Sequence, residues 1–325
     1  MALAPFNTKF FDKGASPVSA DVTQGNVYYC KPGTGSDSND GLTPAKAFKT
    51  LAHAHSVMTA NQNDILYFLA EHNTAASTTD YQSTTLTWSK NLCHLIGVGA
   101  PTMVSQRSRI AQLSTATGIS PLVSITASGC YFSNFQIFHG VADATSLIAC
   151  TVSGQRNVFD HVHFAGIGDA TQSAAGCASL SIDAGAENTF TNCVIGLDTA
   201  VRDADATELL CDTAATRNFF DNCLFQSYIS ATGAALVTIA DTTGIDRWLW
   251  FRNCLFMSKS TNKTVDMAEV FDIPAGISQG AIILQGCSVM DDGGAPVWTA
   301  GTEGIIWADM GAPTASAAGG LMTNL

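Results

Sequence analysis

Two aspartates have the best spacing in the sequence to act as a pair of acids. Asp160 and Asp221 stand at the same position in two copies of a short pattern that recurs along the chain. If the copies stack as successive strands, the two carboxylates lie roughly 9 to 10 Å apart, at the upper edge of an inverting glycosidase pair. Arg252 holds this position in the next copy, where it would keep Asp221 ionised. We therefore expect structural pairing of Asp221, with catalysis by Asp160 and Asp221 as the alternative.

A second group of oxygen ligands occurs in a polar turn. Asp37, Asn39 and Asp40 precede Gly41, as ligands do in a calcium loop, but the downstream glutamate of an EF-hand is missing. An Asx-rich turn is the simpler interpretation, and calcium is the alternative. His161 and His163 imply no third metal ligand, and no nucleophile elbow or phosphate loop occurs. We expect no cofactor, no metal and no enzyme activity.

The recurring pattern is an apolar residue, any residue, Asn or a substitute, then Cys or an apolar residue, any residue and an apolar residue. Its central positions are Asn134, His161, Asn192, Asn222, Asn253 and Gly286, with steps of 27, 31, 30, 31 and 33 residues. A second β-like run precedes each copy, and a last such run, Gly304–Trp307, has no copy after it. Two or three short strands in about 30 residues is the period of a parallel β-helix and is shorter than a propeller blade.

Alternate residues of a strand point inward, and in this pattern the alternation shifts by one residue at the central position. A single residue in the left-handed conformation makes such a corner, and Asn and Gly tolerate that conformation best. Stacked corners would form a hydrogen-bonded ladder of Asn134, Asn192, Asn222 and Asn253. The same stacking puts Cys193, Cys223, Cys254 and Cys287 in one inward column, about 4.8 Å apart. We interpret these four as buried thiols without catalytic function.

These corners resemble those of the pectate-lyase-like right-handed β-helix family, over roughly residues 61 to 310. The strand Val27–Cys30, the polar turn after it and the run Pro44-x-x-Ala47-Phe48-x-Thr50-Leu51 are similar to the first segment of many phage and bacterial surface β-helices. The fold class that follows is all-β, with a short capping helix that begins at Thr43 and Pro44 and covers the first coil with Phe48, Leu51 and Ala52. We divide the chain into an arm (1–26), a cap (27–60), the β-helix (61–310) and a flexible tail (311–325).

Composition excludes several functional classes. The 325 residues are 46% hydrophobic and 13% charged, which requires a packed chain. A net charge of −12 argues against nucleic acid and anionic membranes as partners. The first residues lack the pattern of a secretion signal, so we expect synthesis in the host cytoplasm.

One outward column suggests an interface. Val194, Leu224 and Leu255 follow three successive corners and would expose an apolar stripe, unless a loop at 226–234 or 259–268 covers it. Phage β-helices that resemble this chain pack three abreast. The resemblance therefore implies a structural virion protein, a homotrimeric capsid decoration or cement protein whose partners are itself and a major capsid or other virion protein. The alternatives are a tailspike-type enzyme that degrades polysaccharide and a carbohydrate-binding β-helix.

Overall fold

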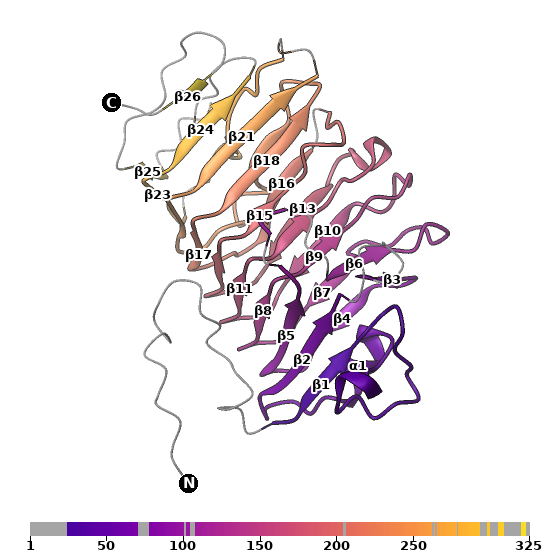
Figure 1. The fold of residues 1–325 in the computed structure, drawn as a ribbon. Coiled ribbons are helices and arrows are strands. Elements are labelled where there is room, and N and C mark those ends of the chain that lie inside the picture. Colours follow the sequence, from indigo (N-terminus) through magenta and orange to yellow (C-terminus); the bar gives the residue numbers. More distant parts are fainter. Residues whose placement is uncertain are drawn as a thin grey trace.

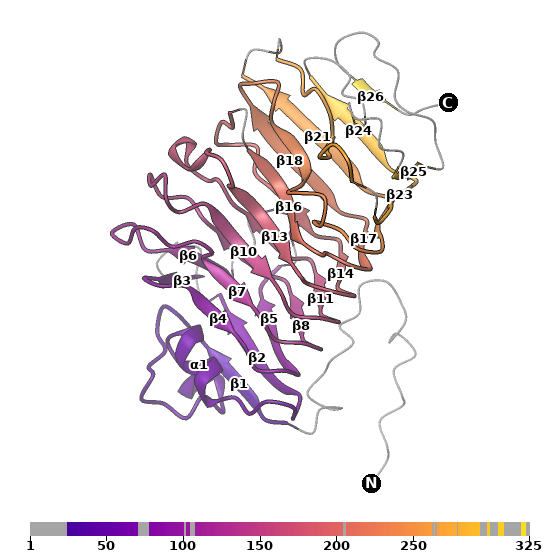
Figure 2. The same ribbon diagram turned by 180° about the vertical axis from the view of Figure 1, so that it is seen from behind.

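The protein is a solenoid of stacked coils, seen from two opposite sides in Figures 1 and 2. The computed structural model describes residues 25–70, 78–100, 102–104, 108–203, 206–261, 263, 265–277, 279–292, 298–299, 305–308 and 320–322. A full coil contributes one strand to each of three sheets, and the chain then climbs to the next coil. The predicted all-β, right-handed parallel β-helix with a short helix near its N-terminus is confirmed.

We name the sheets A, B and C in the order in which each coil visits them. Sheet A has ten strands: β1 (Val27–Cys30), β2 (Asp64–Leu69), β5 (Cys93–Val98), β8 (Tyr131–Ser133), β11 (Val158–Asp160), β14 (Thr189–Thr191), β17 (Asn218–Asp221), β20 (Leu249–Arg252), β23 (Ile282–Gln285) and β25 (Ile306–Ala308). Sheet B has nine: β3 (Thr79–Gln82), β6 (Arg109–Gln112), β9 (Gln136–Phe138), β12 (His163–Ala165), β15 (Val194–Ile195), β18 (Leu224–Ile229), β21 (Leu255–Ser260), β24 (Ser288–Asp291) and β26 (Gly320–Met322). Sheet C has seven: β4 (Leu86–Trp88), β7 (Val123–Ile125), β10 (Ile148–Val152), β13 (Ala178–Asp183), β16 (Thr207–Thr213), β19 (Ala235–Ile239) and β22 (Phe271–Asp272).

A single left-handed residue joins sheet A to sheet B in six successive coils. The φ angles are 58° at Asn134, 53° at His161, 54° at Asn192, 55° at Asn222, 52° at Asn253 and 61° at Gly286. The Asn222 side-chain amide donates to Asn192 Oδ1 over 2.7 Å, and the Asn192 amide donates to Asp160 Oδ1 over 3.1 Å. The Asn134 amide donates to the Gly97 carbonyl over 2.9 Å. The corner residues thus form short runs of hydrogen bonds along the solenoid axis.

Inside the corner, identical side chains stack from coil to coil. The rings of Phe132, Phe159, Phe190, Phe220 and Phe251 form one column with centroid separations of 4.6 to 4.9 Å. The thiols of the cysteine column lie against this stack, where Cys193 donates to the Phe159 carbonyl and Cys223 to the Phe190 carbonyl, both over 3.4 Å. All ten cysteines are free and buried. Desolvation raises the pKa of Cys223 and Cys254, so these thiols stay protonated.

A second asparagine ladder, which we did not predict, lies inside the turn from sheet C to sheet A. Asn157, Asn188 and Asn218 are fully buried. The Asn157 backbone N–H donates to Asn188 Oδ1 (3.0 Å), and the Asn188 backbone N–H donates to Asn218 Oδ1 (3.1 Å). Their side-chain amides donate to backbone carbonyls of the equivalent turn one coil earlier. The ladder satisfies backbone groups that the turn removes from water.

The N-terminal cap differs in detail from the prediction. Only Pro44–Lys46 forms a 3₁₀ turn, and Thr43 makes no side-chain capping bond. The α-helix α1 (Leu51–Val57) begins later, where Thr50 Oγ1 accepts from the His53 N–H. The chain is extended between the two helices because Phe48 pairs with β1 through Cys30. Phe48 and Leu51 are buried as expected, but Ala52 is exposed.

The terminal segments lie largely outside the described residues. Of the predicted arm (1–26) the structure describes 25 and 26, and of the predicted tail (311–325) it describes 320–322. Those three residues form β26, which pairs antiparallel with β24 of the same chain. We expected the run that ends at Trp307 to lie in the same sheet as the other runs that precede the corner pattern, which is sheet C. It instead contributes to β25, at the edge of sheet A. The division into arm, cap, β-helix and tail stays a prediction.

A buried ion pair fixes the long connection from β15 to β16. The Arg202 guanidinium and the Glu208 carboxylate are separated by 2.8 Å, and their side chains are 0% and 1% exposed. Ser179 donates to Glu208 over 2.6 Å. Arg202 also pairs through its backbone with Ile229 of β18. The connection therefore folds back onto the body of the solenoid.

Candidate functional site

The outer face of sheet A carries two columns of side chains, on either side of the inward phenylalanines. From the fourth coil onward, the first column reads Tyr131, Val158, Thr189, Phe219, Trp250, Ile283 and Trp307. The second reads Ser133, Asp160, Thr191, Asp221, Arg252 and Gln285. The first column is aromatic and apolar toward the C-terminus, and the second is polar throughout.

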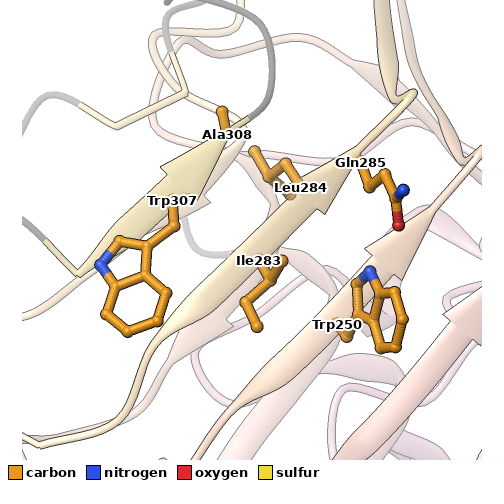
Figure 3. A pocket seen from close by; sticks show the side chains of 6 residues that line it. All are labelled: Trp250, Ile283, Leu284, Gln285, Trp307 and Ala308. Carbon is orange, nitrogen blue, oxygen red and sulfur yellow. The ribbon is translucent and has the colours of Figure 1, made fainter.

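Three aromatic rings and one isoleucine form a platform at the C-terminal end of the first column. We call Phe219, Trp250, Ile283 and Trp307 the aromatic platform. Figure 3 shows Trp250, Ile283 and Trp307 side by side on three neighbouring strands. They line a hollow of about 420 Å³ together with Leu284, Gln285 and Ala308. Trp307 is 62% exposed, so a large apolar surface faces solvent here.

Arg252 and Asp221 form the polar border of the platform. The guanidinium donates to both carboxylate oxygens, over 2.9 and 2.7 Å. Its central carbon lies 4.8 Å from the Phe219 ring centroid and 5.7 Å from that of Trp250. Stacking and the bidentate pair hold Arg252 rigidly over the first column. Because both oxygens of Asp221 are occupied, this carboxylate is poorly placed to donate a proton.

Asp160 sits two strands away in the same column, in a separate polar cluster. Oδ1 accepts from His161 Nδ1 (2.8 Å) and from Asn192 Nδ2 (3.1 Å), and Oδ2 accepts from the Tyr131 hydroxyl (3.1 Å). Burial alone would raise the pKa of Asp160, but the hydrogen bonds from His161 and Asn192 outweigh it and leave the pKa below its usual value. The hydrogen bond to Asp160 raises the pKa of His161. Thr191 separates Asp160 from Asp221, so the two carboxylates have different partners and share no proton.

The predicted apolar interface stripe is not exposed. Val194 is 0% and Leu224 8% exposed, and Leu255 is partly buried. Neither Val194 nor Leu224 belongs to the main core, so both lie on the outer side of sheet B, as strand alternation requires. Alternation fixes the side of the sheet but not what lies over it, which is why the exposure was predicted wrongly. The loops that we expected to cover the stripe explain its burial only in part, because residues 226–229 and 259–260 belong to strands.

The side chains of all three calcium candidates form local hydrogen bonds. Asp37 accepts from the Lys49 and Thr50 N–H groups and from the Thr50 hydroxyl, over 2.8 to 2.9 Å. The Asn39 amide donates to the Ala47 carbonyl, and Asp40 accepts from the Leu42 N–H. Among the described residues no group of three His, Cys, Asp or Glu side chains is arranged to hold a metal. These bonds tie the turn to residues 47–50, which connect the 3₁₀ turn to α1.

Sheet C carries an acidic group that the sequence pattern did not indicate. Burial, and then the charges of Asp183 and Asp241, raise the pKa of Asp212. Asp241 has a lowered pKa, because it accepts hydrogen bonds from the Thr243 hydroxyl and backbone. The three aspartates stand at different positions relative to the ends of their strands. They therefore form no single column of the repeat, and the sequence pattern does not reveal them.

No helix in the described part of the chain is long and apolar enough to cross a membrane.

Comparison with solved structures identifies the same fold in polysaccharide-active enzymes. Pectin methylesterase from Aspergillus niger is 13% identical and superposes with a TM-score of 0.50 over 90% of this chain and 91% of its own. Pectate lyase Pel9A is 13% identical, with a TM-score of 0.49 over 79% of this chain and 67% of its own. ORF18 of Geobacillus virus E2 is 13% identical, with a TM-score of 0.44 over 72% of this chain and 47% of its own. No sequence family and no curated protein sequence matches the chain.

This finding corrects one expectation. We expected no enzyme activity because the sequence contains no recognisable catalytic motif, but the similar structure from Aspergillus niger is a pectin methylesterase. The lack of a motif in this fold is therefore no argument against catalysis. At 13 to 16% identity the likeness establishes architecture alone. The chain has the pectate-lyase-like right-handed parallel β-helix fold.

Proposed function

We propose that the outer face of sheet A binds a polysaccharide. The observation that carries this proposal is the aromatic platform, in which Trp250 and Trp307 flank Ile283 around an open hollow. An indole ring offers a large, rigid apolar face and one N–H donor. The apolar C–H faces of pyranose rings stack on such surfaces, while their hydroxyl groups remain available to polar neighbours.

The repeat of the solenoid matches that of an extended sugar chain. Successive strands of a sheet are about 4.8 Å apart, close to the length of one pyranose residue in an extended polysaccharide. Trp250 and Trp307 lie two strands apart, with Ile283 between them. The two indoles therefore have the spacing needed to contact alternate sugars of a chain that runs along the solenoid axis.

The border of the platform supplies the polar contacts that such a ligand needs. Gln285 lines the hollow, and Arg252 with Asp221 lies on the next strands of the same column. A few fixed polar groups beside an apolar floor are typical of small-molecule sites. The fold is compatible with such a ligand, since the Aspergillus niger structure of similar architecture is a pectin methylesterase.

An array of neutral and uronic-acid polysaccharides tests the proposal. We expect Trp307→Ala and Trp250→Ala each to weaken binding about tenfold or more, the factor that corresponds to about 1.4 kcal/mol. Tyr81→Ala is the matched control, because Tyr81 is an aromatic residue of sheet B that is 45% exposed. Equal binding by the wild type and both tryptophan variants would overturn the proposal. A reducing-sugar assay on the bound glycans, repeated with Asp160→Asn, measures cleavage in parallel.

A place on a phage particle stays a prediction. It rests on the resemblance of residues 27–51 to phage β-helices, because the apolar stripe that also supported it is buried. A homotrimer and a major capsid protein as partners rest on the same resemblance. Sedimentation at micromolar concentration tests the trimer, and a single species at 34.0 kDa would contradict it.

A further inference from the structure

We propose that the outer face of sheet C binds a basic segment of a partner protein, and that a hollow on this face receives one of its lysine side chains. The hollow has a volume of about 250 Å³ and is lined from β16, β19 and β22 of sheet C and from the connections that precede β13, β16 and β19. It lies on a different sheet from the aromatic platform. The proposal therefore goes beyond polysaccharide binding, and the failure of either leaves the other standing.

Sheet C is an acidic face of the solenoid. None of the seven strands that the structure describes in this sheet contains Lys or Arg. Asp183, Asp212 and Asp272 lie on β13, β16 and β22, and Asp241 follows β19, whereas the buried Glu208 of β16 is held in an ion pair. Burial, and then the charges of Asp183 and Asp241, raise the pKa of Asp212, so these three carboxylates lie close enough to interact. A bound cation relieves their mutual repulsion.

The hollow combines aliphatic walls with one carboxylate. Ala175, Ala206 and Leu210 supply apolar surface, while Thr238 and Asp272 supply a hydroxyl and a carboxylate. Leu210, Thr238 and Asp272 are in register on three neighbouring strands, so they form one outward column. Asp272 is exposed, and within the described part of the chain its carboxylate forms no hydrogen bond or ion pair. Its charge is therefore available to a ligand.

A buried hydroxyl without a partner continues the same column. Ser181 is in register with Leu210, one strand away. Its neighbours Leu180 and Ile182 belong to the core, so Ser181 points outward, to the side of the sheet on which the hollow lies. Ser181 is 1% exposed, and its hydroxyl has no hydrogen-bond partner among the described residues. Buried polar groups are rarely left unpaired, because the loss of their hydration is then not compensated. A polar ligand in the hollow supplies the missing partner.

These features fit a lysine of a polypeptide. A lysine side chain is an aliphatic stem that ends in a compact ammonium group with three donors. The stem packs on the aliphatic walls, and the ammonium group donates to Asp272 and to the Thr238 hydroxyl. Ser181 lies three strands from Asp272, about 14 Å away, which is beyond one lysine side chain, so its hydroxyl is left for the backbone of the same segment. Arginine prefers bidentate carboxylates and aromatic faces, and the lining of the hollow contains one carboxylate and no aromatic ring.

Calorimetric titration of the whole chain with a pentalysine peptide, blocked at both ends, tests the proposal. Asp272→Asn removes the carboxylate of the hollow, and Thr238→Phe fills the hollow without a change of charge. Asp212→Asn is the matched control, because it removes one charge from the same face outside the hollow. Pentaarginine and a pentalysine with acetylated side chains are the control ligands. The thermal transition of each variant verifies its fold.

We expect Asp272→Asn and Thr238→Phe each to weaken pentalysine binding about tenfold. Asp212→Asn should weaken it about twofold at most, because water and salt screen an exposed charge outside the hollow. Equal losses in Asp272→Asn and Asp212→Asn would overturn the hollow as the lysine site.

The ligands and the chain's own lysines decide the occupant. Acetylated pentalysine should not bind, and pentaarginine as tight as pentalysine would overturn the choice of lysine. A wild type that does not bind pentalysine would overturn the proposal as a whole. Tighter pentalysine binding after Lys9→Gln combined with Lys13→Gln would assign the hollow to the chain's own N-terminal segment and would overturn the partner protein as its occupant.

Discussion

Four buried histidines make the stability of the solenoid sensitive to mild acid. Burial lowers the pKa of His55, His94, His139 and His163 from 6.5 to about 4. Below pH 6.5 the unfolded chain takes up protons at these rings, whereas the folded chain does not until about pH 4. The unfolded state is therefore favoured progressively as the pH falls from 6.5 toward 4.

The size of the effect follows from the width of this window. At pH 5 each ring is 1.5 pH units below its unfolded pKa, which corresponds to about 2 kcal/mol, or about 8 kcal/mol for the four. Asp80 acts in the opposite direction, because burial raises its pKa to about 6 and its protonation in the folded state regains about 1 kcal/mol. The net loss of about 7 kcal/mol is comparable to the whole stability of a typical domain.

Urea unfolding followed by tryptophan fluorescence at pH 7, 6 and 5 measures this loss. His139→Leu removes one fully buried ring, and we expect it to reduce the difference between pH 7 and pH 5 by about 2 kcal/mol. Ser56→Ala, on the same helix as His55, replaces a group that does not titrate and should leave the difference unchanged. Equal free energies of unfolding at pH 7 and pH 5 in the wild type would refute the argument.

Three further predictions concern the interior. In chemical denaturation, Asn188→Ala should lower the free energy of unfolding by about 3 kcal/mol, because it leaves the Asn157 N–H and the Gly154 carbonyl without their partners. Asn222→Gly keeps a residue that tolerates the left-handed corner, so its free energy of unfolding should be nearly unchanged. Arg202→Met should lower the free energy of unfolding by about 3 to 5 kcal/mol, because it leaves Glu208 buried and unpaired. The double variant Arg202→Met with Glu208→Gln should recover most of this loss. A double variant no more stable than the single one would contradict this. All ten cysteines are buried, so we expect no reaction with a thiol reagent until the protein unfolds, and rapid labelling of the native protein would show otherwise.

The repeat was predictable because its physical requirement is local. One residue must turn the chain with positive φ, the next residue must be buried inside the solenoid, and both needs are visible at Asn192 and Cys193. The same spacing also contained the inner ladder, since Asn157, Asn188 and Asn218 stand four residues before successive corners. We missed that ladder because an asparagine inside an irregular turn leaves no hydrophobic periodicity.

The site was less predictable because it depends on contacts between coils and on which segments cover the outer faces of the sheets. Asp160 and Asp221 were correctly placed in one outward column, but the sequence did not indicate that Tyr131 and Asn192 would both donate to Asp160. The burial of Val194 depends on segments distant in sequence. The aromatic platform was missed because Trp307 was placed outside the sheet that carries Trp250.

A solenoid also supplies its own internal comparison, which locates function better than any motif here. What the fold requires recurs at the same position of successive coils, as the phenylalanine stack does over five of them. In the first outer column of sheet A, Val158 and Thr189 hold positions where Trp250 and Trp307 stand further on, so the sheet itself does not require aromatic rings. Exposing an indole to the extent seen at Trp307 sacrifices the free energy of its burial. We therefore assign the residues that break the repeat on this face to the proposed binding rather than to folding.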